Sequence, residues 1–192
     1  MVNARAGTGT GRPMADGADL QLQARHTTAR FDFDTDEVET EEATVGELVA
    51  ADAELDYAVL RLAPGPARPV LKLADGPLAV ARGDYVAVNI IQHPGGRPKR
   101  VALRNNLVYE ADEHDIRYFT DTRGGSSGSP VLTDDWKVVA LHRGTRRVEN
   151  VQFQGRTTAF VNVGTQMRSV MRHLETTSPG VHAEIAAAQA AV

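Results

Sequence analysis

The sequence predicts an all-β protein with helix confined mainly to the C-terminal end, and three observations lead to this prediction. Short segments of alternating or continuous apolar residues recur along the 192 residues, which is the pattern of β-strands. Turns that contain glycine, proline or aspartate separate these segments. Helical spacing of apolar residues occurs near the C-terminus, at Val163, Met167, Val170, Met171 and Leu174.

The expected strands follow one another from residue 30 onwards. Phe31 and Phe33 alternate with aspartates, and the acidic run at 34–42 indicates a solvated hairpin loop, because it lacks the central glycine and the spacing of a calcium loop. A helix is expected to end at Ser178, and the alanine-rich segment 181–192 is expected to form a second one. Further strands are expected at 44–50, 54–62, 85–92, 101–103, 106–109, 116–120, 130–133, 137–141 and 157–163.

Composition excludes several classes of function. Hydrophobic residues make up 42% and charged residues 24% of the chain, as in ordinary globular proteins. A net charge of −4 disfavours nucleic acid and anionic membranes as partners. The chain has no cysteine, no motif for a metal or cofactor, no membrane-spanning apolar run, and no signal-peptide core at residues 1–5. We therefore predict a cytoplasmic protein that needs no metal or cofactor.

Residues 1–29 depart from the strand pattern. They are rich in Gly, Ala, Thr and Arg and show no sustained period, so we expect a poorly ordered or truncated segment. Leu20 and Leu22 permit one short strand that leads to His26. The predicted organisation is this N-terminal segment, a domain at 30–175 and a helical tail at 176–192.

A glycine- and serine-rich motif at 125–130, with the sequence GSSGSP, lies between expected strands. Glycines on both sides of Ser127 let the backbone fold tightly around its hydroxyl, so that amide N–H groups can converge on one point. Ser127 is then a candidate nucleophile, with the N–H groups of Gly125 and Ser127 as an oxyanion hole. The strand-turn-helix elbow of α/β-hydrolases fits less well, because Ser129 replaces its last glycine and Pro130 begins a strand.

This motif resembles the nucleophile segment of chymotrypsin-fold, trypsin-like serine peptidases, especially the disulfide-free bacterial branch that includes the glutamyl endopeptidases. The resemblance covers residues 30 to about 175 and implies two antiparallel β-barrels with a cleft for a peptide or protein substrate between them. The first barrel is expected to be incomplete, because the paired strands that precede the histidine in the family have no clear counterpart here. A C-terminal helix is implied to lie against the second barrel.

The resemblance also implies a catalytic triad of His26, Asp56 and Ser127. An aspartate at the entry to the apolar segment 54–62 needs a charged or donating partner, and Asp56 matches the family's triad aspartate. The family order of His, Asp and Ser leaves His26 as the base. The match is incomplete, because the usual threonine is missing and four residues separate His26 from Phe31. We expect His26 not to be held between the other two, and His93 to be structural.

Three residues are candidates for the pocket that reads the substrate side chain. In the resembling family an acidic residue at the position of Asp121 favours Lys or Arg, whereas Thr122 with His142 resembles the carboxylate-binding pair of glutamyl endopeptidases. Asp121 could also neutralise His142 as an ion pair. Two functions stay open from the sequence: a serine endopeptidase, or an impaired relative that serves as a peptide- or protein-binding module.

Overall fold

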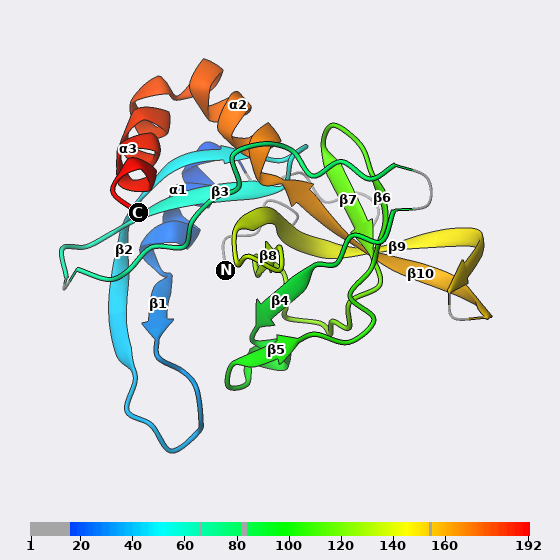
Figure 1. The fold of residues 1–192 in the computed structure, drawn as a ribbon. Helices are drawn as coiled ribbons and strands as arrows, with labels where there is room; N and C mark the ends of the chain where they lie inside the picture. The colour runs from blue at the N-terminus through cyan, green and yellow to red at the C-terminus, as the bar shows by residue number, and fades with distance from the viewer. Residues whose placement is uncertain (1–15, 66, 82–83, 154) are drawn as a thin grey trace.

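The computed structural model describes residues 16–65, 67–81, 84–153 and 155–192, which form two antiparallel sheets and three α-helices (Figure 1). The mainly β architecture agrees with the prediction. The first sheet has the order β1-β2-β3, from β1 (Thr28–Phe31), β2 (Glu41–Asp52) and β3 (Tyr57–Leu62). The second has the order β5-β4-β8-β9-β10-β7-β6, from β4 (Asn89–Gln92), β5 (Arg100–Ala102), β6 (Val108–Ala111), β7 (Asp115–Tyr118), β8 (Pro130–Leu132), β9 (Val138–Phe153) and β10 (Arg156–Gln166).

The second sheet is strongly curled. Residues just before β4 bond to residues just before β6: the Val88 N–H donates to the Asn106 carbonyl at 2.6 Å, and the Val108 N–H donates to the Val86 carbonyl at 2.8 Å. The enclosed space is filled by the main core of the protein, which includes Val88, Ile90, Val108, Ile116, Tyr118 and Val131. These bonds give the second sheet the barrel-like form that the sequence predicted, and burial of this apolar surface stabilises it.

The first sheet is smaller and lacks comparable closure among the described residues. Its three strands pair in sequence order, so that β1 and β3 are its edges. The acidic run predicted as a loop does connect β1 to β2, although β2 begins at Glu41, within that run. A three-stranded sheet agrees with the expectation that the first barrel is incomplete.

The structure corrects the expectation for the start of the chain. A helix, α1 (Gly17–Arg25), occupies the place where one short strand was predicted, and the alternation of Leu20 and Leu22 was misleading. The Asp16 carboxylate caps the helix by accepting the Asp19 N–H at 2.8 Å. The Gln21 side chain then bonds to both backbone groups of Leu48 in β2. The cap and the Gln21 contact connect this helix to the first sheet. The expectation of a poorly ordered or truncated N-terminal segment stays a prediction, and residues 1–15 lie outside the described residues.

A second correction concerns the segment 85–92, which was expected to be one long strand. Regular pairing begins only at Asn89, and Tyr85 is 87% exposed. The preceding residues instead cross to the other end of the sheet through the bridge between Ala87 and Leu107. The continuous apolar pattern in this segment reflects burial where the curled sheet comes together, and not one long strand with regular pairing.

The C-terminal helices α2 (Met167–Thr177) and α3 (Pro179–Ala190) pack where the two sheets meet (Figure 1). Val170 and Leu174 of α2 bury against Tyr57 of the first sheet, with Leu141 of β9 at the margin of the cluster. The helix therefore contacts the first sheet as well as the second barrel that the resemblance implied. No helix in the described residues is long and apolar enough to cross a membrane.

Candidate functional site: a serine loop on the second sheet

The loop between β7 and β8 carries Ser127 and has two glycines in left-handed conformations. Gly125 has φ +93° and Gly128 has φ +86°, which L side chains rarely adopt. A Cβ atom on Gly125 would also lie 2.9 Å from the backbone nitrogen of Gly95. Both the conformation and the close approach therefore require glycine at position 125.

Backbone hydrogen bonds fix the orientation of the peptide unit between Gly124 and Gly125. The Ser126 N–H closes a turn onto the Arg123 carbonyl at 3.1 Å, and the Gly124 carbonyl accepts the Gly95 N–H at 2.8 Å. In a trans peptide unit the C=O and N–H point in opposite directions. Because the Gly124 carbonyl points toward Gly95, the Gly125 N–H points to the other side of the loop.

The N–H groups of Gly125 and Ser127 donate to no acceptor within the part of the chain that the structure describes. Two amide N–H groups on one tight loop, oriented before any substrate arrives, are what an oxyanion hole consists of. Ser127 itself is exposed, and its hydroxyl bonds to none of the described residues. The geometry agrees with the roles predicted for Gly125 and Ser127, which stay predictions.

Hydrogen bonds between buried side chains support this loop from the interior of the protein. Ser126 and Gln92 are 1% and 5% exposed, and the Ser126 hydroxyl donates to the Gln92 side-chain oxygen at 2.6 Å. The Gln92 amide donates in turn to the Asp121 carbonyl at 3.0 Å. Sequence reasoning missed the contributions of Gln92 and Gly95. The available signal was an amide residue at the end of a strand, directly before a His-Pro-Gly-Gly turn.

Backbone bonds also join the loop to β9. The Gly128 N–H donates to the His142 carbonyl at 2.7 Å, and the His142 N–H donates to the Ser129 carbonyl at 2.9 Å. The loop is thus held by the end of β4, by the turn after it, and by β9. Such support on several sides keeps the two N–H groups in place without a ligand.

The turn after β4 also links the serine loop to the first sheet. His93 stacks on Phe33 with ring centroids 5.8 Å apart, and the Lys99 N–H donates to the Phe33 carbonyl at 2.9 Å. His93 Nδ1 lies 3.0 Å from the Arg97 carbonyl oxygen, within the same turn. These contacts support the structural role that the sequence predicted for His93.

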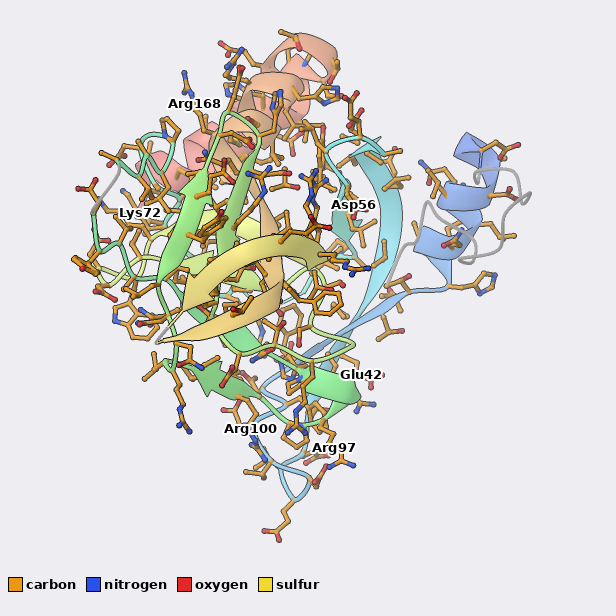
Figure 2. The ribbon with its side chains drawn as sticks, turned by 90° about the vertical axis from the view of Figure 1, so that its right-hand side faces the viewer. Glu42, Asp56, Lys72, Arg97, Arg100 and Arg168 are labelled. Atoms are coloured by element: carbon orange, nitrogen blue, oxygen red, sulfur yellow. The ribbon has the colours of Figure 1, made fainter. Side chains whose placement is uncertain are left out.

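Asp56 lies in the turn between β2 and β3, directly before Tyr57, and Figure 2 labels it at that turn. Its φ is +54°, a left-handed conformation that Asp tolerates better than most residues. The turn is anchored to the second sheet, because Thr165 in β10 donates its hydroxyl to the Leu55 carbonyl at 2.7 Å. The Asp56 carboxylate is exposed and makes no hydrogen bond or ion pair to the described residues.

His26 follows the last residue of α1 and caps that helix with its backbone N–H. Its imidazole is exposed and bonds to neither Asp56 nor Ser127 within the described ranges. The structure therefore shows no hydrogen-bonded triad. The helix α1, found where a short strand had been considered, leaves His26 exposed at the helix end.

A cavity of about 300 Å³ contains two of the three predicted pocket residues, Asp121 and Thr122. The Thr122 hydroxyl donates to the Asn162 side chain at 2.7 Å. His142 does not line this cavity, but its Nδ1 lies 2.7 Å from the hydroxyl of Tyr118, which does. His142, the third predicted residue, therefore contacts the cavity lining through Tyr118 without lining the cavity itself.

The ion pair considered between Asp121 and His142 is not formed. His142 is 4% exposed, and burial lowers its pKa from 6.5 to about 4, so the ring is neutral near pH 7. Burial also raises the pKa of its partner Tyr118. The Asp121 side chain is exposed and accepts a long bond from Asn105 at 3.4 Å. The buried, neutral His142 ring and the exposed Asp121 side chain thus have separate partners.

An oxyanion-type loop around an exposed serine, held on an antiparallel sheet, defines the class of serine peptidases and their relatives. A family model described as the trypsin-like peptidase domain matches residues 15–141, which is most of the chain. The chain therefore belongs to the trypsin-like peptidase domain family. The narrower likeness to glutamyl endopeptidases stays a prediction.

Relatives and solved structures give more distant likenesses. The chain is 48% identical over 67 residues to the uncharacterized protein y4fB of Sinorhizobium fredii, and 36% identical over 114 residues to secreted RxLR effector protein 73 of Plasmopara viticola. These matches cover 31% and 52% of this chain but only 10% and 27% of those proteins. An inactive serine-to-alanine mutant of Rv3671c from M. tuberculosis is 18% identical with a TM-score of 0.47, over 73% of this chain and 68% of that one.

Proposed function

We propose that this domain acts on peptide bonds as a serine endopeptidase, through an acyl-enzyme on Ser127. The observation that supports this most strongly is the oriented loop, in which the Gly125 and Ser127 N–H groups have no other acceptor among the described residues. Donors that are aimed before the reaction stabilise the negative oxygen of the tetrahedral intermediate. A peptide or protein is then the partner of this site.

In the proposed reaction, the Ser127 Oγ attacks the scissile carbonyl carbon while a base removes its proton. The carbonyl oxygen becomes an oxyanion and accepts hydrogen bonds from the Gly125 and Ser127 N–H groups. The protonated base then gives its proton to the leaving amine, and water hydrolyses the ester on Ser127. His26 is the candidate base and Asp56 the residue that would orient it.

The position of His26 limits the rate in this arrangement. Its imidazole is exposed beyond the end of α1 and contacts neither partner within the described chain. General-base catalysis contributes about 10²–10⁴-fold to rates of this kind, so hydrolysis is slow until an imidazole reaches Ser127.

The same observation favours a second candidate function, in which the domain binds peptides at this loop without cleaving them. The oriented N–H groups and the adjoining cavities would then hold a peptide carbonyl and its side chains. The two candidates share the binding site and differ only in the presence of a working base.

Cleavage of dye-labelled, denatured casein tests the proposal, with fragments identified by mass spectrometry. We expect slow cleavage that disappears in Ser127→Ala. Ser129→Ala is the matched control, because only its backbone takes part in the bonds to His142 and Ser126, and it should cleave like the unmodified chain. Cleavage that survives in Ser127→Ala contradicts the proposal. Peptide binding without any cleavage by the unmodified chain favours the binding module.

A further inference from the structure

A second, larger cavity adjoins the serine loop and is lined by arginines. Its volume is about 900 Å³, and Arg97, Arg100, Arg104 and Arg123 all line it. Among its described lining residues only Asp121 is acidic. Figure 2 shows Arg97 and Arg100 at the end of the molecule opposite to Arg168.

These four arginines differ from most others in the protein, because none of them pairs with a carboxylate in the described parts of the chain. Among the described residues, the guanidinium groups of these four arginines make one hydrogen bond, which Arg100 donates to the Lys99 carbonyl at 3.0 Å. By contrast, Arg68 bonds to both Asp32 and Glu41. Four arginines without a carboxylate partner among the described residues therefore share one hollow.

Two acidic residues at the ends of the acidic loop pair with cations outside the cavity lining. Asp34, at the start of the acidic loop, forms an ion pair with Lys99, and Glu42, at its end, pairs with Arg30 at 3.2 Å. The cavity thus stays positive in a chain whose net charge is −4. A concave surface with charges of one sign focuses its field and attracts groups of the opposite sign.

Continuity with the serine loop connects this charge to the proposed function. Gly124 lines the cavity, and its carbonyl belongs to the peptide unit that orients the Gly125 N–H. Asp121 and Thr122 line both this cavity and the smaller pocket. The cavity therefore lies beside the serine loop, on the side toward which the Gly124 carbonyl points, within reach of a peptide that runs past this loop.

We propose that the arginine-lined cavity binds an acidic segment of the peptide or protein that occupies the serine loop. This inference rests on the proposed function in that a peptide must use this loop, but it does not require that the peptide be cleaved. Planar guanidinium groups pair with carboxylates through two parallel hydrogen bonds, so glutamate and aspartate side chains match four such groups. The cavity is thus a subsite that selects acidic substrates beyond the pocket next to Ser127.

The lining argues for an acidic peptide over nucleic acid. Single-stranded nucleic acids bind through aromatic side chains on which bases stack, and none of the described lining residues is aromatic. The apolar lining consists of small and aliphatic side chains, including Pro94, Val101 and Leu103, which suit the stems of glutamate residues. The volume of the cavity fits a few side chains rather than a duplex.

Fluorescence anisotropy with the full chain carrying Ser127→Ala measures this binding without any cleavage. The probe is a fluorescein-labelled peptide of alternating Glu and Ala, and its comparison is the same peptide with Gln in place of Glu. The cavity variant is Arg97→Glu with Arg100→Glu, and Arg104→Gln with Arg123→Gln is a milder second variant. Arg168→Glu is the matched control, since Arg168 is equally exposed and unpaired among the described residues.

We expect the Glu peptide to bind at least about tenfold more tightly than the Gln peptide, with the difference shrinking as salt increases. Both cavity variants should lose this preference, while Arg168→Glu keeps it. Equal affinity for the two peptides, or equal losses in Arg168→Glu and the cavity variants, overturns the proposal. Tighter binding of a single-stranded oligonucleotide that the cavity variants abolish would assign the site to nucleic acid instead. Because Ser127→Ala is used throughout, a failure of catalysis cannot produce any of these results.

Discussion

The nucleophile loop and the histidine segment are built in opposite ways. The loop around Ser127 is held by the buried pair Gln92 and Ser126 and by backbone bonds to Gly95 and His142. His26, in contrast, lies just beyond a short helix with its imidazole exposed. Most of the contacts that hold the serine loop come from the second sheet and the turn after β4. The histidine segment depends instead on the first sheet, which is smaller and open at its edges.

The largest expected effect comes from Gly125→Ala, which tests whether the loop is as constrained as its contacts indicate. Alanine would adopt φ +93° with strain, and its Cβ would meet the Gly95 nitrogen at 2.9 Å. Loss of one oxyanion donor costs about 10²–10³-fold in rate, so we expect the rate of casein cleavage to fall by that factor. Gly180→Ala, where a Cβ meets nothing within 4 Å, is the control. Similar rates for both variants would show that the loop adapts.

A second prediction concerns Gln92, which connects β4 to the loop. Gln92→Leu leaves the Ser126 hydroxyl and the Asp121 carbonyl without their partner, which destabilises the fold by about 1–3 kcal/mol. We also expect a lower cleavage rate, because the loop loses its support. Gln166→Leu is the matched control: this glutamine is also buried and bonds to Leu78 and Asp112, away from the loop. The free energy of unfolding, measured in urea, should fall for both variants. The cleavage rate should fall only in Gln92→Leu.

A third prediction concerns the pH dependence of stability that His142 causes. Burial lowers the pKa of folded His142 from 6.5 to about 4, so the unfolded state binds more protons between these values. The stabilisation is complete above about pH 6.5, declines as the pH falls, and has been lost below about pH 4. A shift of this size corresponds to about 3 kcal/mol. Urea unfolding from pH 7 to pH 4 should therefore show a flatter profile for His142→Gln, and an unchanged profile would contradict neutral burial.

Sequence reasoning worked best where local pattern and turn chemistry agree. The glycines around Ser127 adopt backbone conformations that few other residue types adopt, and a hairpin follows at Pro130. The motif can therefore be recognised from the sequence alone. The short strand considered at the start of the chain was wrong for a physical reason. Leu20 and Leu22 alternate, but the Asp16 cap and the contact of Gln21 with β2 favour a helix. Such long-range contacts leave little trace in the local pattern.

The support of the site was harder to predict than its nucleophile. Gln92 acts through a partner 34 residues away in sequence, and the close approach of Gly95 to Gly125 depends on the curling of the whole second sheet. His142 had been considered as a partner of Asp121, yet its ring pairs with Tyr118. In each case the partner follows from tertiary packing rather than from spacing along the chain.

A fluorophosphonate probe labels only an activated serine, so its rate of reaction with Ser127 shows whether a base is in place. If the serine loop is preformed and His26 is out of reach, we expect slow labelling that is absent in Ser127→Ala and unchanged in His26→Ala. A loss of about a hundredfold or more in His26→Ala, as expected for removal of a general base, would show that His26 does complete the site and would contradict the account.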